Sequence, residues 1–139
     1  MAVQGAAIGP IVGRLGERRT LLLGLACGAI GFLIFGIAAD GRMFWLGIPV
    51  MALWGVAGAA TQALMTRLVA ADQQGRLQGA TSSVQAVSQL LGPFLFTLTF
   101  AHFIGEGAPI KLVGAPFYLA CALVLLASAI AAVTLAGSK

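Results

Sequence analysis

The side chains of this chain that are best suited to bind a ligand are neutral amides and hydroxyls in one long apolar stretch, 77–104. Successive residues of a helix are rotated by about 100°, which brings residues three and four apart onto one side. The polar residues that share one side of this stretch are Gln78, Ser82, Gln85 and Gln89 in a narrow arc, with Thr81 and Ser88 at its edge. We call these six residues the polar stripe. Because amides and hydroxyls exchange hydrogen bonds without carrying charge, the polar stripe suits an amphipathic ligand.

The polar stripe has two interpretations. Uncharged amides that face lipid are costly, so the stripe should face protein or a watery cavity. Its side chains could hold neighbouring helices together by hydrogen bonds, or they could line a substrate path. We favour the substrate path because the stripe extends over several helical turns, which is more than helix packing requires. Thr61 and Gln62 add polarity to the preceding apolar stretch, where helix contacts are the favoured interpretation.

Residues that would support enzyme or metal chemistry are scattered. The chain has one histidine and four acidic residues, and no pair of nucleophile and base or cluster of metal ligands can be proposed from them. Cys27 and Cys121 lie in apolar stretches without metal-binding spacing, so we interpret them as small packing residues. His102 is near the end of its stretch and is interpreted as an interfacial residue. We therefore expect no catalytic residue, no bound metal and no cofactor.

The elements that carry these residues are predicted to be membrane-spanning helices. The chain is 60% hydrophobic and 9% charged, with a mean hydropathy of +1.01. A helix rises about 1.5 Å per residue, so roughly 20 apolar residues cross a bilayer. Four runs without a charged residue reach that length: 20–39, 43–66, 77–105 and 112–138. These runs are continuously apolar and lack the alternation of barrel strands, which favours helices.

The predicted fold is an all-α, polytopic transmembrane bundle of about four and a half helices, forming one domain over 1–139 in a lipid bilayer. We expect spans at about 20–39, 44–66, 77–104 and 113–136, preceded by a partial helix over 1–13. Gly24 and Gly28 in the first span have the spacing of closely packed helices. Gly92 and Pro93 should kink the third span, because proline removes a backbone donor and clashes with the preceding turn.

The charges of the chain predict its topology and give no sign of a nucleic-acid partner. The net charge is +4, but the basic residues lie in short connections and form no stretch interleaved with aromatics. If the connections alternate between the two sides, six basic residues lie on one side and two on the other. The positive-inside rule then places the larger set, which includes Lys139 at the C-terminus, in the cytoplasm.

The sequence from 9 to 19 resembles the cytoplasmic loop signature of the major facilitator superfamily. The matching residues are Gly9, Arg14, Gly16, Arg18 and Arg19, while Gly13 stands where the signature has aspartate. Two later segments, 72–79 and 91–96, resemble the tenth-to-eleventh loop and the eleventh helix of bacterial tetracycline efflux carriers. The resemblance covers essentially the whole chain and points to the TetA-like branch of the drug:proton antiporters.

This resemblance implies a place in a larger carrier of a bacterial inner membrane. It aligns the chain with the last third of a twelve-helix fold, from the end of helix eight to the end of helix twelve. It implies export of a tetracycline-like amphipathic drug in exchange for protons by alternating access, with the polar stripe beside the path. The loop arginines would either latch neighbouring helices or only fix the topology.

The resemblance also implies a missing N-terminal part, which would complete the substrate cavity. That part would supply the acids that exchange protons, because no acidic residue lies inside a predicted span of this chain. The chain alone is therefore expected to be inactive. A small membrane interaction protein that binds or modulates another carrier is the alternative. A minimal four-helix multidrug exporter is less favoured, because it would need an intramembrane glutamate.

Overall fold

The computed structural model of the chain describes residues 16–38, 40–104 and 112–137. The helices are α2 (Glu17–Ile37), α3 (Gly41–Arg67), the 3₁₀ turn η1 (Ala71–Gln73), α4 (Gln74–Ile104) and α5 (Ala115–Gly137). The described residues form no strand, and all four α-helices are long and apolar enough to cross a membrane. The predicted helical transmembrane fold is thus confirmed. The partial helix expected over 1–13 lies outside the described residues.

The observed helices start earlier than the predicted spans at three of the four N-terminal ends. α2 begins at Glu17, so Arg18 and Arg19 lie in its first turn, although we expected them in a loop. In the same way, α3 includes Arg42 and α4 includes Arg76. An uncharged run measures the part of a helix that suits the hydrocarbon core, whereas the helix itself continues into the polar boundary region. Charge patterning therefore underestimates helix length in a membrane protein.

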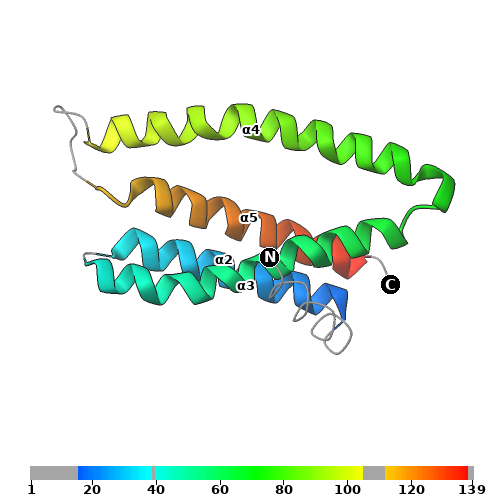
Figure 1. Cartoon of the computed structure of the whole chain (residues 1–139), viewed down its shortest axis with the longest axis horizontal. Helices are drawn as coiled ribbons and strands as arrows, with labels where there is room; N and C mark the ends of the chain where they lie inside the picture. The colour runs from blue at the N-terminus through cyan, green and yellow to red at the C-terminus, as the bar shows by residue number, and fades with distance from the viewer. Residues whose placement is uncertain (1–15, 39, 105–111, 138–139) are drawn as a thin grey trace.

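Helices α2, α3 and α5 form one packed unit, in which α2 and α3 run side by side (Figure 1). Leu21, Ala57 and Ala60 are buried at the contact between α2 and α3, and Leu135 of α5 packs against them. The two helices approach closely at Gly24, where an added Cβ would lie 2.7 Å from the Cβ and 2.8 Å from the backbone nitrogen of Ala57. Only a residue without a side chain fits this distance, which agrees with the close packing predicted at Gly24.

Three aromatic rings join the same helices at the opposite end from Glu17. Phe35 of α2 stacks on Phe44 of α3, with their ring centroids 4.8 Å apart. Phe117 of α5 meets both rings edge-on, at 5.9 and 6.1 Å. Aromatic pairs of this geometry add about 0.5–1.5 kcal/mol each beyond their buried area. The cluster fixes the α2–α3–α5 unit at this end.

Helix α4 lies along one side of the α2–α3–α5 unit (Figure 1). None of its residues is buried, in contrast to those of α2 and α3. It remains one continuous helix through Gly92 and Pro93, and the kink at these residues stays a prediction. Helix α3 also contains a proline, Pro49, within its length.

Candidate functional site

The connection between α3 and α4 brings their adjoining ends together. α3 ends at Arg67, η1 reverses the chain, and α4 begins at Gln74. The two helices are joined by an amide pair, in which Nε2 of Gln62 donates a hydrogen bond to Oε1 of Gln78 at 3.1 Å. The polar stripe thus meets α3 at its first member. The Gln62 side chain takes part in a helix contact, as its sequence context favoured.

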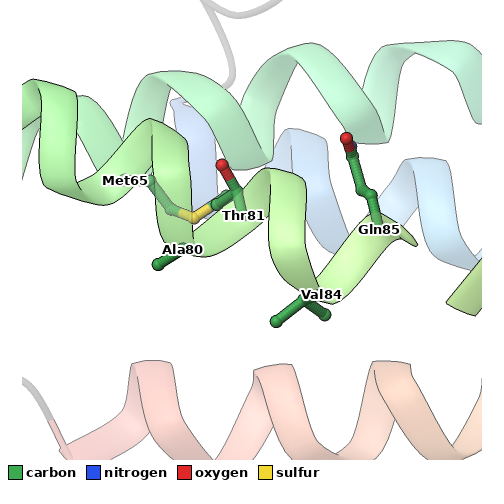
Figure 2. A pocket seen from close by; sticks show the side chains of 5 residues that line it. All are labelled: Met65, Ala80, Thr81, Val84 and Gln85. Carbon is green, nitrogen blue, oxygen red and sulfur yellow. The ribbon is translucent and has the colours of Figure 1, made fainter. Parts of the chain in front are cut away.

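A cavity of about 370 Å³ is lined by residues that follow the two glutamines of this pair along α3 and α4. The residues that line it are Met65 of α3 and Ala80, Thr81, Val84 and Gln85 of α4. The side chains of Thr81 and Gln85 point toward one side of α4, while Ala80 and Val84 point toward the other (Figure 2). We call this space the Met65 cavity. It has an apolar wall with a hydroxyl and an amide at one edge.

The hydrogen-bonding state of the polar groups decides what they can offer a ligand. The Thr81 hydroxyl donates to the backbone carbonyls of Leu77 and Gln78, at 3.1 and 3.0 Å. The Ser88 hydroxyl donates to the carbonyl of Val84 at 2.9 Å. Such bonds use the single hydroxyl hydrogen, so the oxygens remain as acceptors. Within the part of the chain that the structure describes, the Gln85 amide makes no hydrogen bond and keeps all its donors and acceptors.

The structure brings only part of the polar stripe together. Thr81 and Gln85 line the Met65 cavity, and Gln78 pairs with Gln62. The members of the polar stripe that take part in neither the cavity nor the amide pair are Ser82, Ser88 and Gln89, all of them exposed along α4. Their assignment to a substrate path stays a prediction. Sequence reasoning missed Met65, whose position three residues after Gln62 puts it on the same side of α3.

The loop motif has its described residues at the N-terminal end of α2. Gly16 adopts a φ of 79°, a backbone conformation that favours glycine, and its carbonyl accepts a hydrogen bond from the Thr20 hydroxyl at 2.8 Å. Arg18 and Arg19 are exposed in the first turn of the helix. Gly9 and Arg14 lie outside the described residues. Gly16 therefore shapes the start of α2, and the latch or topology role of the arginines stays open.

An ion pair next to this motif escaped the sequence analysis. Oε1 of Glu17 lies 3.0 Å from Nε of Arg67, the last residue of α3. The Glu17 side chain is 12% exposed and the Arg67 side chain is 77% exposed, so the carboxylate is the shielded partner. A carboxylate in the first turn of a helix also interacts favourably with the positive end of the helix dipole. Opposite charges at adjoining ends of consecutive spans were the signal that could have identified the pair.

A second cavity, of about 380 Å³, lies on the α2–α3 side of the molecule. The residues that line it are Leu25, Trp54, Gly55, Ala57, Gly58 and Thr61. The Thr61 hydroxyl donates to the carbonyl of Ala57 at 2.8 Å, so its hydrogen is already used. This cavity offers a ligand less polar contact than the Met65 cavity does. Among the described residues, no group of three or more His, Cys, Asp or Glu side chains could hold a metal ion.

Comparison with known proteins gives matches among antibiotic resistance proteins. The chain is 37% identical over 119 residues to the class G tetracycline resistance protein of Vibrio anguillarum, covering 85% of this chain and 30% of that protein. It is 31% identical over 122 residues to the class C protein of Escherichia coli, with the same coverage. The human hippocampus abundant transcript 1 protein is 30% identical over 100 residues, covering 72% of this chain and 20% of that protein.

No family model matches the sequence, and no solved structure gives a significant match. The chain spans about 30% of the length of the tetracycline resistance proteins that it matches. These matches agree with the resemblance of its loop motif, and together with four helices that suit a membrane they support a multi-pass membrane protein. The chain is therefore a relative of the TetA-like tetracycline resistance proteins of the major facilitator superfamily.

Proposed function

We propose that this chain takes part in the export of a tetracycline-like drug in exchange for protons, with α4 beside the substrate path. The observation that carries the proposal is the Met65 cavity, where an amide without a partner among the described residues adjoins an apolar wall. Sites for drug-sized ligands are mostly apolar with a few placed polar groups. An amphipathic drug matches both parts of this lining.

The packing of α4 supports a movement of the kind that alternating access requires. The α2–α3–α5 unit has a buried core, whereas no residue of α4 is buried. Separate packing of this kind allows a helix to change neighbours without disrupting a core. We propose that the exposed surface of α4 faces the remaining helices of a complete carrier, in which this chain corresponds to the end of helix eight through helix twelve. Such a carrier would lie in a bacterial inner membrane with the C-terminus of this chain in the cytoplasm.

The proposal is tested by exchanging the aligned segment of the class G protein for this chain. The assay measures tetracycline uptake into everted membrane vesicles under an imposed proton gradient. We expect tetracycline uptake that a protonophore abolishes. Gln85→Leu should reduce this uptake, because the substitution replaces the amide by an apolar side chain of similar size. The unaltered class G protein and the exchange protein carrying Ser83→Ala serve as controls.

The outcome that contradicts the proposal must be separated from misfolding. Topology reporters fused to the exchange protein check that it inserts like the class G protein. A correctly inserted exchange protein that neither binds nor transports tetracycline would contradict the carrier function. It would favour the alternative of a small membrane interaction protein.

A further inference from the structure

We propose that the outer side of α2 binds an anionic phospholipid, whose headgroup phosphate pairs with Arg18 and Arg19 and whose acyl chain lies along the apolar surface that follows them. The ligand is thus a lipid of the membrane itself and not a transported compound. The inference goes beyond the proposed export function and does not depend on it, because it requires only that the chain spans a membrane.

One side of α2 is an apolar surface that no other described helix covers. Among the described helices, α2 packs on α3 and α5 and not on α4 (Figure 1). The exposed residues of its remaining side recur every three or four positions, and we call them the outer stripe: Leu23, Ala26, Ile30, Leu33 and Ile37. At about 100° per residue, all five lie within about 40° of Arg19 around the helix axis. Arg19 therefore lies at the N-terminal end of the outer stripe.

The length of the outer stripe fits the thickness of a bilayer. At about 1.5 Å per residue, Arg19 and Ile37 are about 27 Å apart along the helix, close to the hydrocarbon thickness of about 30 Å. Ile30 is about 16 Å from Arg19, which is roughly the depth of one leaflet. A lipid with its headgroup at Arg19 can therefore extend its acyl chain past Leu23 as far as Ile30, whose side chains are both 52% exposed.

The charges of Arg18 and Arg19 are available to a headgroup. Both residues are exposed, and neither makes an ion pair with another described residue. The acidic residue next to them in the sequence, Glu17, lies about 160° from Arg19 around the helix, and its Oε1 is 3.0 Å from Nε of Arg67 on the α3 side. Glu17 therefore does not neutralise the two arginines. Guanidinium groups bind phosphate through their paired N–H donors.

The combination of two cations with the outer stripe selects the class of ligand. A free phosphate ion would pair with the arginines but would gain nothing from the apolar surface. A zwitterionic lipid would contact that surface, but the cation of its headgroup would offset the attraction between its phosphate and the arginines. An anionic phospholipid gains from both parts, and each arginine near the membrane surface favours it by about fivefold in affinity.

The test measures lipid selectivity at Leu23 in the full chain reconstituted into phosphatidylcholine vesicles. Cys27→Ser and Cys121→Ser remove the native thiols, and Leu23→Cys carries a bimane fluorophore one helical turn from Arg19. Quenching of this fluorophore is compared between vesicles that contain the same minor fraction of brominated phosphatidylglycerol or of brominated phosphatidylcholine. We expect the anionic lipid to quench as if it bound roughly three- to tenfold more tightly, and high salt to reduce this preference.

Arginine substitutions separate a site on α2 from a general effect of surface charge. Arg19→Gln combined with Arg18→Gln should abolish the preference for phosphatidylglycerol. Arg76→Gln is the matched control, because it removes an exposed arginine from the first turn of α4, and it should leave the preference unchanged. With the fluorophore at Ile37→Cys, at the other end of the outer stripe, the two lipids should quench equally. Quenching by brominated phosphatidylcholine in every variant checks that the labelled position still faces lipid.

Three results would overturn the inference. Equal quenching by the two lipids at Leu23→Cys would show an apolar boundary without a headgroup site. Absence of quenching by either lipid would show that a protein surface, such as a second copy of the chain, covers the outer stripe. A preference that survives the double arginine substitution, or that falls as much with Arg76→Gln, would show that Arg18 and Arg19 do not form the site.

Discussion

At the scale of single residues, Gln85 is the group whose environment has most consequence for function. A buried polar group that is left without a hydrogen-bond partner costs about 1–3 kcal/mol, and Gln85, which is exposed on α4, would meet this cost wherever an apolar neighbour covered it. Within the described residues the Gln85 amide has no partner, while Thr81 and Ser88 satisfy their hydroxyl hydrogens on the helix backbone. An amide that the fold does not satisfy needs water or a ligand. This difference distinguishes Gln85 from Thr81, the other member of the polar stripe that lines the Met65 cavity.

Gly24 gives a prediction about stability at the same scale. Gly24→Val should destabilise the fold by about 1–3 kcal/mol, because the new side chain would collide with the Cβ and backbone of Ala57. The measurement is thermal unfolding in detergent micelles followed by circular dichroism. Gly58→Val is the matched control, since an added Cβ at Gly58 meets nothing within 4 Å. Equal unfolding temperatures for the two variants would show that α2 and α3 are not as close as described.

At the scale of helices, the ends of α2 and α3 are joined by Glu17 and Arg67. An ion pair with a shielded carboxylate stabilises a fold more than a fully exposed ion pair does. Here the exposed guanidinium of Arg67 limits that stabilisation. We expect a coupling energy of about 1 kcal/mol from a double-mutant cycle with Glu17→Gln and Arg67→Gln. Because Arg67 is exposed, raising the salt concentration should reduce this coupling.

The control for this cycle is Arg76→Gln in place of Arg67→Gln. Arg76 is an exposed arginine in the first turn of α4 and makes no ion pair among the described residues. Its cycle with Glu17→Gln should be additive. If the Glu17 and Arg67 substitutions were also additive, the ion pair would contribute nothing to the packing of α2 on α3.

The helices themselves were predictable because a bilayer imposes a simple rule. Four apolar runs of sufficient length became four long helices, and the spacing of Gly24 predicted a close contact that the structure contains. The helix ends were less predictable, since residues such as Arg18 and Arg42 continue a helix beyond the hydrocarbon core. Hydropathy indicates which part of a helix lies in the hydrocarbon core, but it does not indicate the residue at which the helix begins or ends.

The contacts of the candidate site were only partly predictable. The arc that contains Gln78 and Gln85 follows from helical periodicity within one segment. The position of Met65 opposite Thr81 depends on how α3 is rotated against α4, and no periodicity within either segment contains that angle. The same reason applies to Glu17 and Arg67, which belong to different helices. Contacts between elements require the packing, which a single sequence does not supply.

At the scale of the whole molecule, the charges at the helix ends predict on which side of the membrane each end lies. The beginning of α2, the end of α3 and the beginning of α4 carry four of the six basic residues assigned to one predicted side of the membrane, namely Arg18, Arg19, Arg67 and Arg76. We expect a reporter that is active only in the periplasm to stay silent when fused after Lys139, and a cytoplasmic fluorescent reporter to be bright there. The reporters should exchange their behaviour when fused after Asp40. A periplasmic signal at the C-terminus would contradict the topology.

The central claim, that one side of α4 lines a watery substrate path, is tested most directly by thiol accessibility in the exchange protein. Single substitutions Gln85→Cys, Gln89→Cys, Leu90→Cys and Leu91→Cys are made without the native cysteines and exposed to a water-soluble thiol reagent in membranes. We predict fast labelling at 85 and 89 that tetracycline slows, because water and substrate share that surface. Labelling at 90 and 91 should be slow, because those positions face away from the arc. Equal labelling at all four positions, unaffected by tetracycline, would contradict the claim and leave the glutamines as contacts between helices.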